Sequence, residues 1–212
     1  WIDRCHLSSC KPYIFSCEKT ENNYSFTGVM AANCLMPAVE FKLNYEVSGN
    51  ELIATIEYKI ADYIQNLPRF GLEFGVDKAH SNFSYVGFGP TESYNDKHIA
   101  CEYGYYVSSA EENYDRKYIH PQESGSHYAC EYLAVKDLFR VTAEKPFSCS
   151  VNPFTTEQLR ETLHSFELEE NDFVNVCIDI AMRGVGSHSC GPDLPEKYEI
   201  PREGKNTFRF KF

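Results

Sequence analysis

Residues 41–60 read FKLNYEVSGNELIATIEYKI, and this stretch decides the fold class. Apolar and polar side chains alternate up to Val47, which is the period of a β-strand with one face in water. Gly49-Asn50 then offers a two-residue turn, and the alternation resumes through Ile60. We therefore predict an antiparallel β-hairpin over this stretch.

Similar short runs, rich in aromatic and β-branched residues, recur along the rest of the chain. They are separated by turns rather than by helices, which favours an antiparallel sandwich or barrel. The predicted strands are residues 24–32, 70–76, 83–88, 103–107, 128–135, 138–143, 147–151, 174–180 and 208–212. One short helix is predicted near 156–164, where Thr155 and Gln158 form a capping box. The predicted fold is all-β and antiparallel with this single helix.

Length and composition exclude several classes of fold and function for this chain. The chain has 212 residues, too few for a complete (β/α)₈ barrel of roughly 250 residues, and no linker or repeat divides it. We expect one domain over 1–212. The net charge of −11 disfavours nucleic acid and anionic membranes, and no apolar run approaches the roughly 20 residues of a membrane span. The nine Cys lack zinc-type spacing, so we expect reduced thiols, no metal site and a cytoplasmic location.

Three segments place Gly, Pro and polar residues between predicted strands, and they are the candidate functional loops. They span residues 87–97, 118–127 and 184–192. The first could bind a ligand, but we favour a buried network of ion pairs and Tyr hydroxyls, because an ordered loop must satisfy its polar groups. The expected members of this network are Glu92, Tyr94, Asp96 and Lys97. In the second, Gln122, Glu123 and His127 either bind a sugar or cap the turn. The third follows the strongest predicted strand, where long loops often carry function.

Taken in order, these segments resemble the C-terminal domain of family 2 β-galactosidases, which forms the small chain of two-chain versions. Residues 87–97, GFGPTESYNDK, match the pattern Gly-x-Gly-Pro-x-Glu-x-Tyr-x-Asp-Arg, with Lys in place of the final Arg. Residues 118–125, YIHPQESG, match Tyr-x-x-Pro-x-Glu-x-Gly. Residues 184–192, GVGSHSCGP, match a Gly-x-Gly loop followed by a Ser-Trp or Ser-Cys pair and Pro. The segments 67–71 and 159–164 also fit.

The resemblance implies an antiparallel β-supersandwich, the fold shared with galactose mutarotases. It also implies that both catalytic Glu residues and the main metal site lie in a separate (β/α)₈ barrel. We therefore expect no catalytic residue and no cofactor in this chain, with Mg and Na held by the barrel. The expected partners are that catalytic barrel, as a domain or chain of the same enzyme, and a galactoside. We expect the whole enzyme to be oligomeric, and the chain to be trimmed at its N-terminus.

The same resemblance implies a site and a function. In the family, the third loop approaches the sugar, and a Trp stacks on it at the position of Cys190. A thiol has no ring face, so other loop residues would contribute more. The expected substrate-binding residues are Ser187, His188, Ser189 and Cys190. The expected function is to support and partly wall the sugar site of an enzyme that hydrolyses terminal β-galactosides, such as lactose, with retention.

Two other functions remain open on the residues alone. A mutarotase-like sugar epimerase would need His127 or His188 to meet a Glu in a cleft, as acid and base. A free-standing carbohydrate-binding module would use some of the 15 Phe and 15 Tyr for stacking on sugars.

Overall fold

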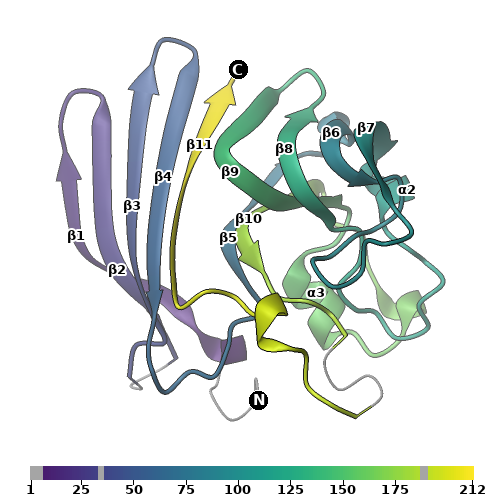
Figure 1. The fold of residues 1–212 in the computed structure, drawn as a ribbon. Coiled ribbons are helices and arrows are strands. Elements are labelled where there is room, and N and C mark those ends of the chain that lie inside the picture. Colours follow the sequence, from purple (N-terminus) through teal and green to yellow (C-terminus); the bar gives the residue numbers. More distant parts are fainter. Residues whose placement is uncertain (1–6, 33–35, 187–190) are drawn as a thin grey trace.

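The predicted hairpin is present as β3 (Val39–Ser48) and β4 (Glu51–Ile60), joined by a turn in which Gly49 has φ of 61°. That backbone conformation favours glycine. The structure is a computed structural model that describes residues 7–32, 36–186 and 191–212. It is an all-β antiparallel sandwich, as the alternation predicts (Figure 1).

A long, curved layer of nine strands forms most of the sandwich. Its order is β1 (Lys11–Lys19), β2 (Asn23–Ala31), β3, β4, β11 (Glu203–Lys211), β9 (Phe139–Asn152), β8 (His127–Val135), β6 (Asn82–Gly89) and β7 (Glu102–Ser109). Figure 1 shows these strands side by side from the purple edge to the teal edge. The edge strand β1 was not predicted, because most of its side chains are exposed and no alternation in burial marks it.

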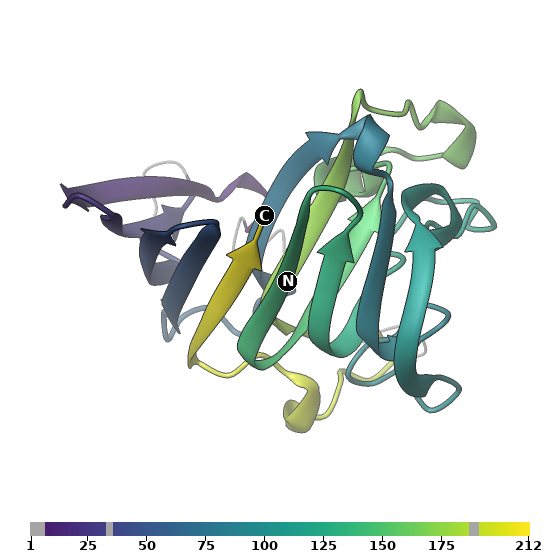
Figure 2. The ribbon, with the colours of Figure 1, turned by 90° about the horizontal axis from the view of Figure 1, so that it is seen from above.

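A second layer contains β5 (Arg69–Asp77) and β10 (Phe173–Met182), which lie behind β11 and β9 in Figure 1 and on the far side of them in Figure 2. Strand β9 belongs to both layers. Its residues 140–143 pair with β11, and its residues 148–152 pair with β10. The two strands predicted at 138–143 and 147–151 are therefore one long strand that turns the corner between the layers.

The aromatic residues largely fill the core between the layers. The ring of Phe74 on β5 lies 6.0 Å from Phe139 and 6.4 Å from Phe210, and Phe147 meets Phe208 at 5.7 Å. One buried cluster contains Phe139, Phe147, Phe208 and Phe210, and Phe74 packs against it. Their burial removes apolar surface from water and so contributes strongly to the stability of the fold.

Two short α-helices interrupt the strands within the described residues, where one was predicted. Helix α3 (Thr156–Glu161) has the predicted capping box, in which the Gln158 N–H donates to Thr155 Oγ1 at 3.1 Å. It ends at Glu161, because Thr162 is already extended. Helix α2 (Ala110–Asn113) was not predicted, since it is only one turn long. Short 3₁₀ turns lie at Leu7–Ser9, Lys78–His80, Ser165–Glu167 and Glu196–Tyr198. In the described ranges no helix is long and apolar enough to cross a membrane.

Candidate functional site

The first and second candidate loops meet at the carboxylate of Glu92. Its Oε1 accepts hydrogen bonds from Lys97 Nζ at 2.6 Å and from the Tyr118 hydroxyl at 3.0 Å. Its Oε2 accepts from the Gly125 N–H at 3.1 Å and from the Tyr94 hydroxyl at 3.3 Å. Burial alone would raise the pKa of Glu92, but the bonds from Lys97 and Gly125 outweigh it and the pKa is lowered. The predicted network is confirmed for Glu92, Tyr94 and Lys97, whereas Asp96, which was expected in it, bonds to the third loop instead.

Arg69, at the start of β5, joins the second loop to strand β10. Its Nε and one terminal nitrogen donate to the two carboxylate oxygens of Asp179 at 3.1 and 2.6 Å. The other terminal nitrogen donates to Glu123 Oε2 at 2.9 Å. Burial would lower the pKa of Arg69, but the charges around it, Asp179 foremost, raise that pKa well above its ordinary value. The guanidinium therefore stays charged and compensates the buried carboxylates.

The first and third loops meet at Asp96. Its Oδ1 accepts from the N–H of Val185 at 3.1 Å, and its Oδ2 accepts from the N–H of Gly186 at 2.9 Å. A Cβ at Gly184 would lie 2.5 Å from the Asp96 carboxyl carbon, and one at Gly186 would lie 3.0 Å from Oδ2. The Gly-x-Gly pattern of the third loop thus allows the carboxylate to approach the backbone.

Asn95 and Arg183 fix the two ends of the same segment. The side-chain amide of Asn95 donates to the carbonyl oxygens of Met182 at 3.3 Å and Tyr198 at 3.1 Å. Arg183, whose side chain is only 5% exposed, donates to Asp193 at 2.8 Å. The start and the return of the third loop are therefore both tied to described residues.

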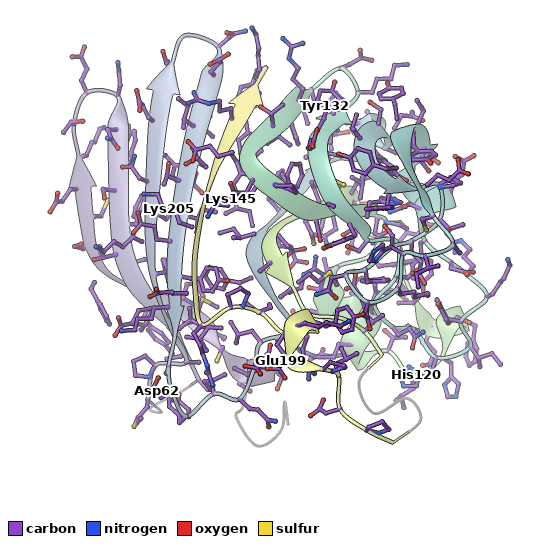
Figure 3. The ribbon with its side chains drawn as sticks, in the orientation of Figure 1. Asp62, His120, Tyr132, Lys145, Glu199 and Lys205 are labelled. Carbon is purple, nitrogen blue, oxygen red and sulfur yellow. The ribbon has the colours of Figure 1, made fainter. Side chains whose placement is uncertain are left out.

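The four residues expected to bind substrate, Ser187, His188, Ser189 and Cys190, lie outside the described residues. The structure describes the loop up to Gly186 and again from Gly191. Figure 3 labels His120 of the second loop and Glu199, which follows the third, and both lie at the same end of the sandwich. The three loops thus gather at one end, which we call the loop end.

His127 of the second loop is buried rather than available to a ligand. It is 1% exposed, stacks on Tyr85 with ring centroids 3.8 Å apart, and its Nε2 donates to Asn113 Oδ1 at 2.8 Å. Asn113 in turn donates to the carbonyl oxygens of Gly125 at 2.7 Å and Val151 at 3.1 Å. Burial lowers the pKa of His127 to about 4. Its role is therefore to hold the second loop on the sandwich, with Nε2 bonded to Asn113 rather than to a Glu.

Within residues 7–32, 36–186 and 191–212, no three His, Cys, Asp or Glu side chains come together in a way that could hold a metal ion. Cys130 and Cys149 are buried reduced thiols with Sγ atoms 3.5 Å apart. Cys17, Cys101 and Cys177 are also reduced, as the sequence predicts.

The sequence did not predict that Asp179 and Asp96 hold the loop end together. Asp179 lies on β10, where the sequence suggested one buried face formed by 174–180, whereas the strand is covered on both faces. Asp96 was expected to join the network of its own loop, but its partner Val185 lies 89 residues away, and nothing local indicates that contact. The available signal was the Gly-x-Gly of the third loop, because closely spaced glycines often mark a close backbone contact. The carboxylates at the loop end therefore serve to position the loops, because they already accept hydrogen bonds from N–H and O–H groups of this chain.

Comparison with known proteins identifies the family of the chain. The model of a family described as β-galactosidase small chain matches residues 4–212. Over 146 residues the chain is 45% identical to a β-galactosidase of Actinobacillus pleuropneumoniae, a match that covers 69% of this chain and 14% of that protein. Over 199 residues it is 32% identical to a β-galactosidase of Staphylococcus xylosus, covering 92% of this chain and 20% of the relative.

These relatives are much longer than this chain, which spans a fifth of their length or less. Among solved structures, the chain matches a galactose mutarotase related enzyme from Lactobacillus acidophilus. That match covers 95% of this chain and 70% of the other, with a TM-score of 0.38 and 10% sequence identity.

Proposed function

The chain belongs to the family of β-galactosidase small chains, and from this membership we propose that it is an accessory part of a family 2 β-galactosidase, at the C-terminal end of the enzyme. The observation that carries the proposal is the family match over residues 4–212. Because the chain spans only 14–20% of its relatives, most of the enzyme lies outside it. That remainder is the proposed location of the (β/α)₈ barrel and its Mg and Na.

The proposed reaction of the whole enzyme is hydrolysis of terminal β-galactosides, such as lactose, with retention. Retaining hydrolysis uses two carboxyl groups roughly 5–5.5 Å apart, one as nucleophile and one as acid and base. At the loop end, Glu92, Glu123, Asp96 and Asp179 each accept hydrogen bonds from donors of this chain. These carboxylates are therefore committed to structure, which supports placing the reacting pair on the barrel.

The proposed contribution of this chain is to wall the sugar pocket with its third loop. Asp96 holds the N–H groups of Val185 and Gly186, directly before Ser187–Cys190. With the third loop anchored there, the hydroxyls of Ser187 and Ser189 and the ring of His188 would supply hydrogen bonds to sugar hydroxyls. Cys190 stands where the family has Trp, so stacking on the sugar would have to come from the barrel.

An exchange of segments tests this function. In the β-galactosidase of Actinobacillus pleuropneumoniae, the segment matched by this chain would be replaced by this chain, and turnover of a chromogenic galactoside measured. We expect turnover by this chimera and none by the chain alone. Robust turnover by the isolated chain would contradict the division of labour, and so would a folded chimera without activity.

A further inference from the structure

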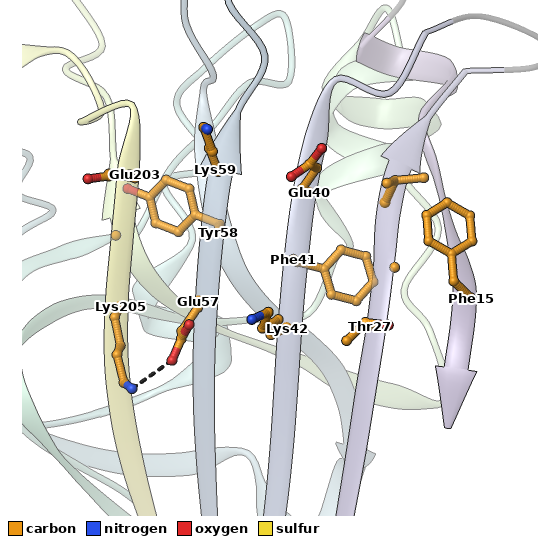
Figure 4. A pocket seen from close by; sticks show the side chains of 13 residues that line it. Phe15, Thr27, Glu40, Phe41, Lys42, Glu57, Tyr58, Lys59, Glu203 and Lys205 are labelled. Carbon is orange, nitrogen blue, oxygen red and sulfur yellow. Dashed lines mark hydrogen bonds and ion pairs between the residues drawn. The ribbon is translucent and has the colours of Figure 1, made fainter. Parts of the chain in front are cut away.

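The outward surfaces of the long layer differ sharply between its middle strands β3, β4 and β11 and the end formed by β8, β6 and β7. On β3, β4 and β11 the outward side chains form cross-strand pairs of opposite charge: Glu40 with Lys59, Lys59 with Glu203, Lys42 with Glu57, and Glu57 with Lys205. These charged residues line a groove of about 760 Å³, together with residues of β1 and β2 and the aromatic side chains Phe15, Phe41 and Tyr58 (Figure 4). We call the surface formed by the charged pairs the charged face. Its charges are balanced, as expected of a surface that water covers.

At the β7 end of the layer, β6, β7 and β8 present apolar and aromatic side chains outward. Phe83 and Tyr85 of β6 are buried in the core, so the alternate residues of β6 and their cross-strand partners point away from it. We call this surface the outer aromatic face; it consists of Val86, Phe88, Tyr103, Tyr105, Val107 and Tyr132. Figure 3 labels Tyr132 of this face and Lys205 of the charged face, on separate parts of the layer.

The side chains of the outer aromatic face on β7 are well exposed. Tyr103 is 46%, Tyr105 63% and Val107 72% exposed. Phe88 packs against Tyr103 with ring centroids 5.4 Å apart. Contiguous apolar patches of this kind mark interfaces, and buried Tyr and Phe dominate interface energetics. Strand β7 is also the edge of the layer, with only β6 beside it among the described strands.

We propose that the outer aromatic face docks onto the large remainder of the β-galactosidase, through an apolar surface rimmed by Lys or Arg. This inference rests on the proposed function. At least four fifths of the length of these two relatives lies outside the part that this chain matches, so a large partner surface is available. Burial and the nearby charge of Glu131 raise the pKa of Tyr103, and Glu131 gives the face an acidic border.

Charge favours this partner over a second copy of the chain. Each copy carries a net charge of −11, so a pairing of two identical surfaces would bring like charges together. A basic rim on a different surface would instead complement Glu131 and raise the association rate.

The test compares backbone hydrogen exchange in the isolated chain and in the chimera described above. We expect amides of residues 103–107 to exchange on the order of tenfold more slowly in the chimera, because docking removes them from water. Amides of residues 40–42 on the charged face should exchange equally in both. This readout does not depend on turnover, so an inactive but folded chimera would count against the proposed function while still testing the docking.

A pair of double variants completes the test. Tyr105→Ser with Val107→Ser alters only exposed side chains, so the isolated chain should keep its melting temperature, whereas the chimera should lose the added protection of β7. Lys42→Ser with Lys59→Ser is the control on the charged face and should leave that protection intact. Equal exchange of residues 103–107 in the isolated chain and in the folded chimera would overturn the proposal. The proposal would also be overturned if the isolated chain forms a dimer and the double variant Tyr105→Ser, Val107→Ser abolishes that dimer.

Discussion

Two ion pairs in this protein have the same N···O distance, 2.6 Å, and lie in very different surroundings. Arg69 and Asp179 meet at the loop end, where their side chains are 18% and 3% exposed. Lys205 and Glu57 meet on the charged face, where theirs are 55% and 42% exposed. Distance alone would rank these pairs as equal. The difference in burial separates them. A buried charge that loses its partner cannot be hydrated in its place, whereas an exposed charge can.

The comparison teaches how the two regions are held together. The charged face belongs to a hairpin and its neighbour, whose register is set by backbone pairing and by apolar side chains on the inner face. The described part of the loop end has only an isolated bridge between Tyr94 and Lys97, and polar contacts between distant segments hold it. Breaking single polar contacts should therefore matter most at the loop end.

Arg69→Ala should produce the largest effect. The substitution leaves Asp179 and Glu123 without their shared cation, and breaking a buried ion pair costs about 3–5 kcal/mol. Unfolding in urea, followed by fluorescence, would measure the lost free energy. Arg69→Lys is the matched control, because it keeps the charge but loses the two-pronged geometry; it should retain part of the stability. An Arg69→Ala variant as stable as the unmodified chain would refute the ranking by burial.

His127 should make the stability of the chain depend on pH. Its pKa is about 4 in the folded chain and about 6.5 when unfolded, so the unfolded state binds more protons between these values. The stabilisation is complete above pH 6.5 and is lost as the pH falls toward 4, by about 3 kcal/mol in total. Urea unfolding at pH 7 and pH 4.5 would measure the loss.

The contribution of His127 is isolated by a variant. Carboxylates also titrate in this range, so the useful quantity is the difference between the unmodified chain and His127→Gln. Gln keeps a donor for Asn113 but does not titrate, and the variant should lose less stability between pH 7 and pH 4.5. Identical losses in the two proteins would show that His127 is not the titrating group.

Much of the fold, but less of the loop end, can be predicted from the sequence. The hairpin at 41–60 repeats every two residues, and that period is a local property of the chain. The network at Glu92 was predictable for a similar reason, since Glu92, Tyr94 and Lys97 are neighbours in sequence. The contacts of Asp96 with Val185 and of Arg69 with Asp179 join residues about ninety or more positions apart. No local pattern encodes such contacts, because they depend on how the layers pack.

Asp96→Ala should have a moderate effect that is confined to the third loop. It removes two hydrogen bonds from N–H groups to a carboxylate, each of which contributes on the order of 1.5–3 kcal/mol when protected from water. Asp96 is only partly buried, so we expect a loss of about 1–2 kcal/mol in all. Hydrogen exchange at Val185 and Gly186 should accelerate, while the amides of β10 keep their protection. Acceleration across the whole chain would instead indicate that Asp96 supports the entire sandwich.

Lys205→Ala should have the smallest effect, although it removes an ion pair as short as that of Arg69 and Asp179. Both side chains are surrounded by water, so each regains hydration when the other is removed, and salt already screens their attraction. The same urea titration should show no change in the unfolding midpoint, at low salt or at 1 M salt. A loss comparable to that of Arg69→Ala would mean that the charged face is covered rather than solvated. That result would also remove the contrast on which the docking of the outer aromatic face rests.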